Sequence, residues 1–203
     1  SLQIKALFVH NNEEISRLKF EMAARLSNPN TGPFTDAQKF SAYIAAQLHN
    51  AVITEPLGDQ LVHQLMDIAG SSHEILSELA SHRNLTHADY DPANILVCKD
   101  GEEWKISGIL DWEFALSSTY YMDIGLMLRY AHRLPKCFQD SFVRGIQEGN
   151  PQLLSSDWEV RAKLIDLVCL LSLCAANPPD KRPQMYGDIK NLLQRTCEFL
   201  GRQ

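Results

Sequence analysis

Hydrophobic residues recur every three or four positions through most of this chain, the spacing of the buried face of an amphipathic helix. Three of these segments begin with a Ser/Thr-x-x-Glu/Gln sequence that is typical of helix N-termini: Thr35-x-x-Gln38, Ser71-x-x-Glu74 and Ser156-x-x-Glu159. The spacing predicts helices over residues 35–49, 58–68, 72–81, 124–132, 138–146, 156–176 and 185–200. We interpret each apolar stripe as a core face.

Two short apolar and β-branched runs interrupt the helices. Ile95–Val97 and Trp104–Leu110 flank Asp100-Gly101, a dipeptide that favours a two-residue turn, so we expect a β-hairpin there. Nearer the N-terminus, Ile4–Val9 is strand-like and Glu13–Leu26 is helix-like, before a breaker that contains two prolines and a glycine. The pattern predicts a mainly α fold with a small central β-hairpin.

Composition places the chain among soluble globular proteins, because 45% of its 203 residues are apolar and 22% are charged. The formal net charge of −6 provides no basic face for a phosphate backbone, so we expect no nucleic-acid partner. The most apolar run, Leu164–Ala176, is shorter than the roughly 18 to 20 residues of a bilayer span, so we expect no membrane association. Five cysteines without a Cys-x-x-Cys pair favour free thiols in a cytoplasmic protein.

Polar side chains gather at both outer ends of the predicted hairpin. Asp89, Asp91 and Asn94 precede its first strand, and Asp111 and Glu113 follow its second. Paired strands lie about 4.8 Å apart, so Asn94 and Asp111 are expected to lie close together. Carboxylate and amide oxygens suit Mg²⁺, and a carboxylate beside them can accept a proton from a hydroxyl. This combination is what phosphoryl transfer requires.

The segment His87-Ala-Asp89-Tyr-Asp-Pro-Ala-Asn94 has the His-x-Asp-x-x-x-x-Asn spacing of a kinase catalytic loop. It resembles the loop His-Gly-Asp-Leu-His-Pro-Gly-Asn of the aminoglycoside phosphotransferase and choline kinase family. Ile109–Ala115 is similar to the family's Ile-Asp-Trp-Glu-x-Ala, and Asp123-Ile-Gly125 to its Asp-Leu-Ala. Ser141–Ile146 and Ile44–His49 resemble two of its helices, so the resemblance extends from about residue 35 to the C-terminus.

The resemblance implies the helical C-terminal lobe of a protein-kinase-like α+β fold, with ATP and Mg²⁺ as cofactors and a small-molecule hydroxyl as acceptor. It implies that Asp89 is the catalytic base and that Asn94 and Asp111 bind Mg²⁺ and thereby the nucleotide. Glu113 would reach a second metal ion or the substrate. The acidic charge of the chain favours a cationic acceptor such as an aminoglycoside or a choline-like amine over a sugar.

Two further residues would support the catalytic loop without touching substrate. By the resemblance, His87 and Asp123 fix the loop through hydrogen bonds.

The chain departs from the family where Ala88 and Ala93 replace glycines. Alanine fits a negative φ but is strained at a positive one, so these positions test the loop geometry. Asp91 replaces a frequent histidine and is expected to bond within the loop or to be solvated, not to ligate metal.

The Gly-rich lid and phosphate-binding Lys of kinase-like enzymes have no counterpart in this sequence, which contains no Gly-x-Gly-x-x-Gly. An N-terminal β lobe needs about 80 to 100 residues at ordinary strand and loop lengths, and about 35 precede the resemblance. We therefore expect residues 1–34 to be a segment of uncertain structure, such as a hinge remnant, and residues 35–203 to be the helical lobe. An active enzyme would need a further lobe or a partner chain, and no ATP turnover is expected from this chain alone.

Other functions remain open on the sequence. A truncated or degenerate kinase-like lobe would act as a binding module without activity. A hydrolytic metal site built from His82, His87, Asp89 and Asp91 is disfavoured, because it leaves the Asp111-Trp-Glu motif unexplained and fits no closed zinc set. A protein kinase is disfavoured as well, because Trp-Glu follows Asp111 where protein kinases have Phe-Gly.

Overall fold

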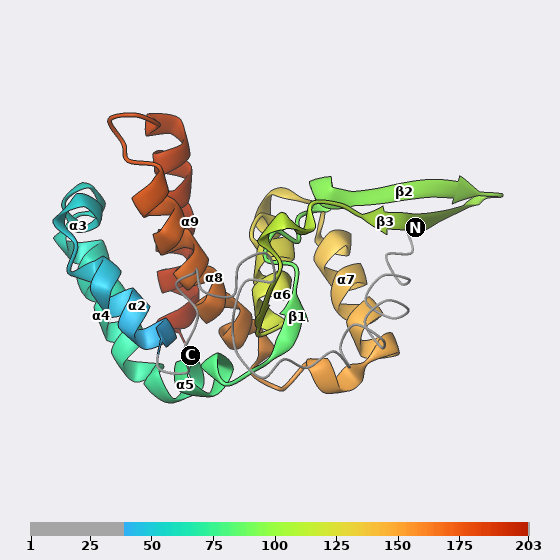
Figure 1. Ribbon diagram of the computed structural model, residues 1–203, viewed down its shortest axis with the longest axis horizontal. Coiled ribbons are helices and arrows are strands. Elements are labelled where there is room, and N and C mark those ends of the chain that lie inside the picture. The colour runs from blue at the N-terminus through green and yellow to red at the C-terminus, as the bar shows by residue number, and fades with distance from the viewer. Residues whose placement is uncertain (1–38, 203) are drawn as a thin grey trace. The chain divides into compact units, whose positions relative to one another are not determined.

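A computed structural model describes residues 39–202 of the chain. The predicted strand Ile4–Val9, the predicted helix Glu13–Leu26 and the capping box at Thr35 lie outside the described residues. The chain forms two compact units, one holding residues 82–158 and the other holding the helices before residue 82 and after residue 158. Helices dominate residues 39–202 as a whole, and the small β structure belongs to the first unit (Figure 1), so the mainly α fold that the sequence predicts is confirmed.

The second unit is entirely helical among the described residues. Its hydrophobic faces meet in a core that includes Ile44, Leu65, Leu76 and Leu164, all with no exposed surface. Arg161 pairs with Glu78 at 2.8 Å. The helices of this unit are α2 (Lys39–Leu48), α3 (Ala51–Leu57), α4 (Asp59–Ser71), α5 (His73–Ala80), α8 (Trp158–Ala176, which starts at the unit boundary) and α9 (Pro183–Leu200).

Helix ends differ from the expected capping pattern. Ser71 is the last residue of α4, where its hydroxyl donates to the carbonyl of Ile68, so the box predicted there is wrong. Helix α8 begins at Trp158 and not directly after Ser156. Helix α3 was not predicted at all: Asn50 caps it by accepting from the amide of Val52, but its seven residues are too few for a clear apolar period.

Two antiparallel strand pairs form the β structure of the first unit. Strand β1 (Asn84–Thr86) pairs with β4 (Leu116–Ser118), and β2 (Ile95–Asp100) pairs with β3 (Glu103–Ile109). The second pair is the predicted hairpin, which projects from the unit (Figure 1). Its central turn residues are Gly101 and Glu102, one position later than expected, and Gly101 has the positive φ that a tight hairpin turn requires.

Helices and short 3₁₀ turns complete the first unit. The predicted helix 124–132 is divided, since α6 (Tyr121–Leu128) ends before a separate turn, Ala131–Arg133. Phe142 and Ile146 bury one face of α7 (Lys136–Gly149). The other 3₁₀ turns are η1 (Pro92–Asn94), η2 (Trp112–Phe114) and η4 (Pro151–Leu153), with η3 the turn at Ala131–Arg133.

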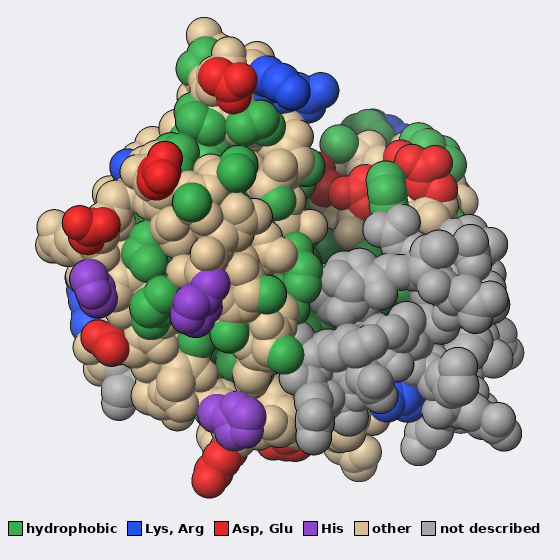
Figure 2. Space-filling view, turned by 60° about the vertical axis from the view of Figure 1, so that its left-hand side comes forward, with side chains coloured by type: hydrophobic (Ala, Val, Ile, Leu, Met, Phe, Trp, Pro, Cys, Tyr) green, Lys and Arg blue, Asp and Glu red, His purple; other side chains and the backbone are tan. Residues whose placement is uncertain are grey.

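The basic side chains, the length of the apolar helices and the cysteines can be described within residues 39–202. Lys and Arg side chains are dispersed at the margins of the face shown in Figure 2 and form no continuous basic surface there. No helix within residues 39–202 is long and apolar enough to cross a bilayer. All five cysteines lie in the described part of the chain, and none of them forms a disulfide. Burial raises the pKa of the Cys174 and Cys197 thiols to about 11, which keeps both protonated at neutral pH.

Candidate functional site

Two strand pairs hold the candidate catalytic loop and the Asp-Trp-Glu segment side by side. The chain leaves β1 at Thr86, passes through the loop 87–94 into β2, returns along β3, and passes through 110–115 into β4. Because β2 pairs with β3 and β4 pairs with β1, both connecting segments are tied at each of their ends. The amide of Leu110 donates to the carbonyl of Asn94 at 2.9 Å, which confirms that the two outer ends of the hairpin meet.

Asp123, in the first turn of α6, holds the start of the loop. The amide of His87 donates to its Oδ2 and the amide of Ala88 to its Oδ1, both at 2.9 Å. Ala88 adopts a φ of 64° to present its amide in this direction. A positive φ is strained for alanine. Ala93, which lies in η1, does not have a positive φ and is unstrained in this respect.

The Asp123 carboxyl is electrostatically unusual. Burial raises its pKa to about 6, although the two backbone amides and His87 each act to lower it. The neighbouring Tyr90 phenol is buried, and burial together with the charge of Asp123 raises the pKa of Tyr90 above its ordinary value. Tyr90 therefore stays neutral and adds no second charge to this interior.

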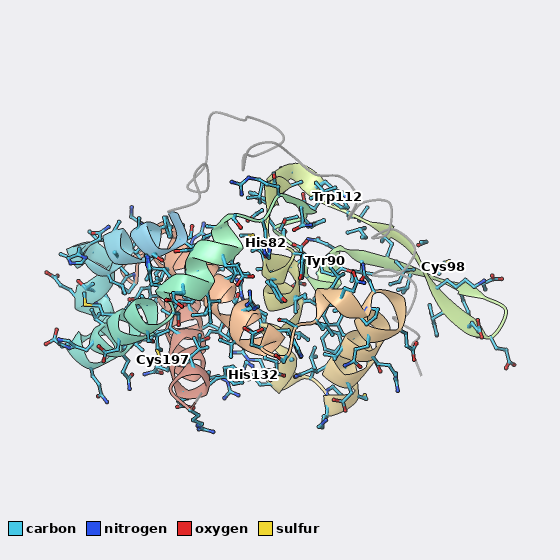
Figure 3. The ribbon with its side chains drawn as sticks, turned by 90° about the horizontal axis from the view of Figure 1, so that it is seen from below. His82, Tyr90, Cys98, Trp112, His132 and Cys197 are labelled. Atoms are coloured by element: carbon cyan, nitrogen blue, oxygen red, sulfur yellow. The ribbon has the colours of Figure 1, made fainter. Side chains whose placement is uncertain are left out.

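His87 is 2% exposed and uses both ring nitrogens. Its Nδ1 accepts from the amide of Asp89 at 3.2 Å, and its Nε2 lies 2.8 Å from the carbonyl of Leu110. The neutral tautomer with the proton on Nε2 satisfies both bonds. The centroid of its ring also lies 5.9 Å from that of Tyr90 and 4.5 Å from that of Trp112 (these two residues are labelled in Figure 3). His87 thus joins the loop to the end of β3.

Asn94 fixes the orientation of Asp89. Its Nδ2 donates to the carbonyl of Asp89 at 2.9 Å and to the Oδ2 of Asp89 at 3.0 Å. These two bonds occupy the amide nitrogen and leave the Oδ1 atoms of both residues without a hydrogen bond inside the described chain. Asp91 bonds within the loop, as expected, by accepting from the amide of Ala93 at 2.8 Å.

Asp111 follows β3 in a left-handed conformation, with φ 65° and ψ 55°. Glu113 lies two residues later in η2. Both side chains are exposed, and neither forms a hydrogen bond or ion pair within residues 39–202. Their carboxylates are therefore available to an external partner at the end of the hairpin where Asn94 also lies.

The side-chain atoms in this region that could bind a metal ion, and that have no hydrogen bond within residues 39–202, are oxygens of Asp89, Asn94, Asp111 and Glu113. That set fits Mg²⁺, which takes one or two carboxylates and completes its shell with water and phosphate oxygens. Within residues 39–202, no three His, Cys, Asp or Glu side chains are grouped closely enough to hold a metal. The hydrolytic site considered from sequence is therefore wrong, and the Nδ1 of His82 instead lies 3.0 Å from the hydroxyl of Thr119.

Sequence reasoning assigned no role to Trp112. Its indole Nε1 donates to the carbonyl of Ile109 at 3.0 Å, and its ring contacts His87. The one available signal was an aromatic residue between two acidic ones in the Asp-Trp-Glu motif, which by itself does not reveal what the ring touches.

Comparison with known proteins identifies the family. Residues 15–184 match the phosphotransferase enzyme family. A crystal structure of the aminoglycoside phosphotransferase APH(4)-Ia, as a thermostable mutant with ADP and hygromycin B, matches 90% of this chain with a TM-score of 0.55 and 17% identity. A second APH(4)-Ia structure gives 0.54 and 16%. The chain spans 61% and 60% of those two proteins, and no curated protein matches it. The chain belongs to the phosphotransferase enzyme family.

Proposed function

We propose that this chain carries the catalytic loop of an ATP- and Mg²⁺-dependent phosphotransferase that transfers the γ-phosphoryl group to a hydroxyl of a small molecule. The observation that carries the proposal is the hydrogen-bonded junction of the two motifs, in which His87 and Asn94 connect the loop to the residues before Asp111. The family match and the shared fold of two aminoglycoside phosphotransferase structures support it.

In this proposal Asp89 is the catalytic base. One of its carboxylate oxygens is held by the Asn94 amide, so the other is directed consistently and free to accept a proton from the acceptor hydroxyl. The His87 ring fixes the backbone of Asp89 through its amide. Asp123 and His87 act as supports of the loop and make no contact with substrate.

We assign Asn94 and Asp111 to Mg²⁺, with Glu113 reaching a second metal ion or the substrate. When bound, Mg²⁺ neutralises charge on the phosphate oxygens. The chain's own contribution is placement. The two bonds of Asn94 Nδ2 fix its side chain, whose Oδ1 accepts no hydrogen bond within residues 39–202, and Asp111 lies nearby because the hairpin pairing ends there.

For the acceptor we propose a small cationic molecule. The net charge of −6 and the exposed carboxylate of Glu113 beside the loop favour a cation over a neutral sugar. One of the similar structures contains hygromycin B, which is consistent with that class.

We propose that residues 35–203 form the lobe that carries the catalytic loop. The proposed nucleotide site also needs groups from outside this lobe. No Gly-x-Gly-x-x-Gly occurs in the sequence, so a lid over the phosphates has to come from a further lobe or a partner chain. Without it, we expect this chain to bind nucleotide no more tightly than the millimolar range and to show no turnover.

Calorimetry with ADP, in the presence and absence of Mg²⁺, tests the proposal on the 203-residue chain. We expect weak binding that requires Mg²⁺, is lost in Asp111→Asn and persists in Asp91→Asn, whose side chain bonds within the loop. Transfer of labelled phosphate from ATP to a panel of aminoglycosides, choline and sugars is measured in parallel. Nucleotide binding that ignores Mg²⁺ and Asp111 would favour the alternative of a degenerate lobe acting as a binding module, and micromolar binding by this chain alone would refute the need for a further lobe.

A further inference from the structure

We propose that Trp112 is a positioning residue: its indole N–H and its ring hold the backbone that sets Asp111 in the left-handed conformation. The inference rests on the proposed metal-binding role of Asp111 only for its functional consequence. The geometry itself involves three consecutive residues of the segment that joins β3 to η2, Leu110–Trp112, and the carbonyl of Ile109 before them.

The conformation of Asp111 requires an explanation. Ala88 and Asp111 are the two non-glycine residues with a positive φ in the described part of the chain. Side chains other than glycine rarely adopt this conformation, and they keep it when surrounding contacts determine it. Within residues 39–202, the Asp111 side chain makes no hydrogen bond that would stabilise this conformation. The restraint must therefore act on the backbone on either side.

Side chains restrain both peptide groups before Asp111. The carbonyl of Ile109 accepts from the Trp112 indole at 3.0 Å, and the carbonyl of Leu110 accepts from His87 Nε2 at 2.8 Å. The amide of Leu110 is bonded as well, to the carbonyl of Asn94. These three bonds fix the backbone of Ile109 and Leu110. For the Trp112 indole to reach the Ile109 carbonyl from there, the backbone has to turn back at Asp111, which is what its left-handed conformation does.

The ring of Trp112 connects this restraint to the catalytic loop. It lies 4.5 Å from the His87 ring at an interplanar angle of 57°. Trp112 therefore bonds the carbonyl of Ile109 and also packs on His87, which bonds the carbonyl of Leu110. The variant Trp112→Phe separates the hydrogen bond from the ring contact, because phenylalanine keeps a ring against His87 and lacks the indole N–H.

Wild-type protein alone gives the first measurement. Hydrogen exchange of the tryptophan indole N–H groups is followed by NMR. Trp104 on β3 is the reference, because it is 45% exposed and its indole forms no hydrogen bond with residues 39–202. We expect the Trp112 indole to exchange about tenfold more slowly than that of Trp104. Equal exchange rates would overturn the proposal without any substitution.

The second measurement compares Trp112→Phe with the matched control Trp104→Phe. We expect Asp111 to lose its positive φ in the first variant, seen in the coupling between its amide and α protons and in its carbon chemical shifts, and to keep it in the second. A positive φ that persists in Trp112→Phe refutes the proposal. This readout is local, so a general loss of stability does not imitate it.

Binding of Mn²⁺, followed by relaxation of nearby protons, reports the functional consequence. We expect Trp112→Phe to weaken Mn²⁺ binding about three- to tenfold, with the affinity of Trp104→Phe unchanged. If the wild type binds no Mn²⁺, the proposed metal role of Asp111 fails while the φ measurement still decides on Trp112. If Mn²⁺ binds equally in all three proteins and φ does not change, the proposal on Trp112 fails and the metal role stands.

Discussion

Replacing Asp123 with Asn removes the buried charge that organises the catalytic loop, and the effect on stability is expected to depend on pH. The Asp123 carboxylate accepts the amides of both His87 and Ala88. An asparagine retains one acceptor and turns an NH₂ group toward the other amide, which leaves a buried N–H unsatisfied at a cost of about 1 to 3 kcal/mol. At mildly acidic pH the folded wild type carries a protonated Asp123, whose hydroxyl oxygen still has lone pairs for the second amide, so we expect Asp123→Asn to be the less stable protein there.

The pH dependence follows from the raised pKa of Asp123, about 6 against 3.8 for the ordinary group. The folded state binds the proton more tightly than the unfolded state, so this contribution to stability is complete below about pH 4 and is lost as pH rises through 6. The whole shift corresponds to at most about 3 kcal/mol, of which about 2 kcal/mol falls between about pH 4.5 and about pH 7. The stability gap between wild type and Asp123→Asn should narrow by that amount.

Urea unfolding followed by circular dichroism measures this gap at several pH values. Glu102→Gln serves as the control for charge removal, because Glu102 is exposed in the hairpin turn of the same unit and has no ion pair within the described residues. A gap that stays constant with pH, or that widens as pH rises, would refute the argument that burial outweighs the hydrogen bonds at Asp123. So would a Glu102→Gln protein with the same pH profile as Asp123→Asn.

Three further outcomes are expected. Ala88→Gly relieves a φ of 64° and should raise the free energy of unfolding by about 0.5 to 1 kcal/mol, whereas Ala93→Gly should lower it, both read from urea denaturation. Asp89→Asn should leave thermal unfolding within a degree or so of wild type and, in a protein that also contains the further lobe, should abolish phosphate transfer from radiolabelled ATP. Phe142→Ala empties a fully buried site in α7 and should cost about 3 to 5 kcal/mol in the same denaturation assay.

The helices were predictable because an apolar stripe is a local property of the sequence. α4, α5 and α9 each carry one, and their observed ranges lie within a few residues of the expected ones. The pair β1 and β4 was not predictable in the same way. Each strand has three residues, two of the six being buried serines, and about thirty residues separate them. Periodicity has no meaning over three positions, so only the tertiary fold reveals this pairing.

The candidate site was predictable to the extent that a hairpin determines it. Asn94 and Asp111 were expected to meet because strands of a hairpin end together, and the Leu110 amide bond confirms that arrangement. The partners of His87 were not, since one is a backbone carbonyl, which carries no sequence signature. The sequence left the sign of φ at Ala88 open and gave no indication of a positive φ at Asp111. Both values depend on contacts with residues distant in the sequence or on side chains whose partners are backbone groups.

The two strained positions bear on whether the loop is functional or a remnant. A left-handed alanine costs of order 1 to 2 kcal/mol relative to an unstrained backbone, and a left-handed aspartate costs less because Asp tolerates this conformation better. One stands directly before Asp89, and the other is Asp111 itself. Both conformations are accompanied by hydrogen bonds that Asp123, His87 and Trp112 form with the backbone at or beside these residues. A lobe used only as a scaffold would gain stability by relaxing these turns, so their persistence beside the free carboxylates favours a site maintained for phosphate chemistry over a degenerate one.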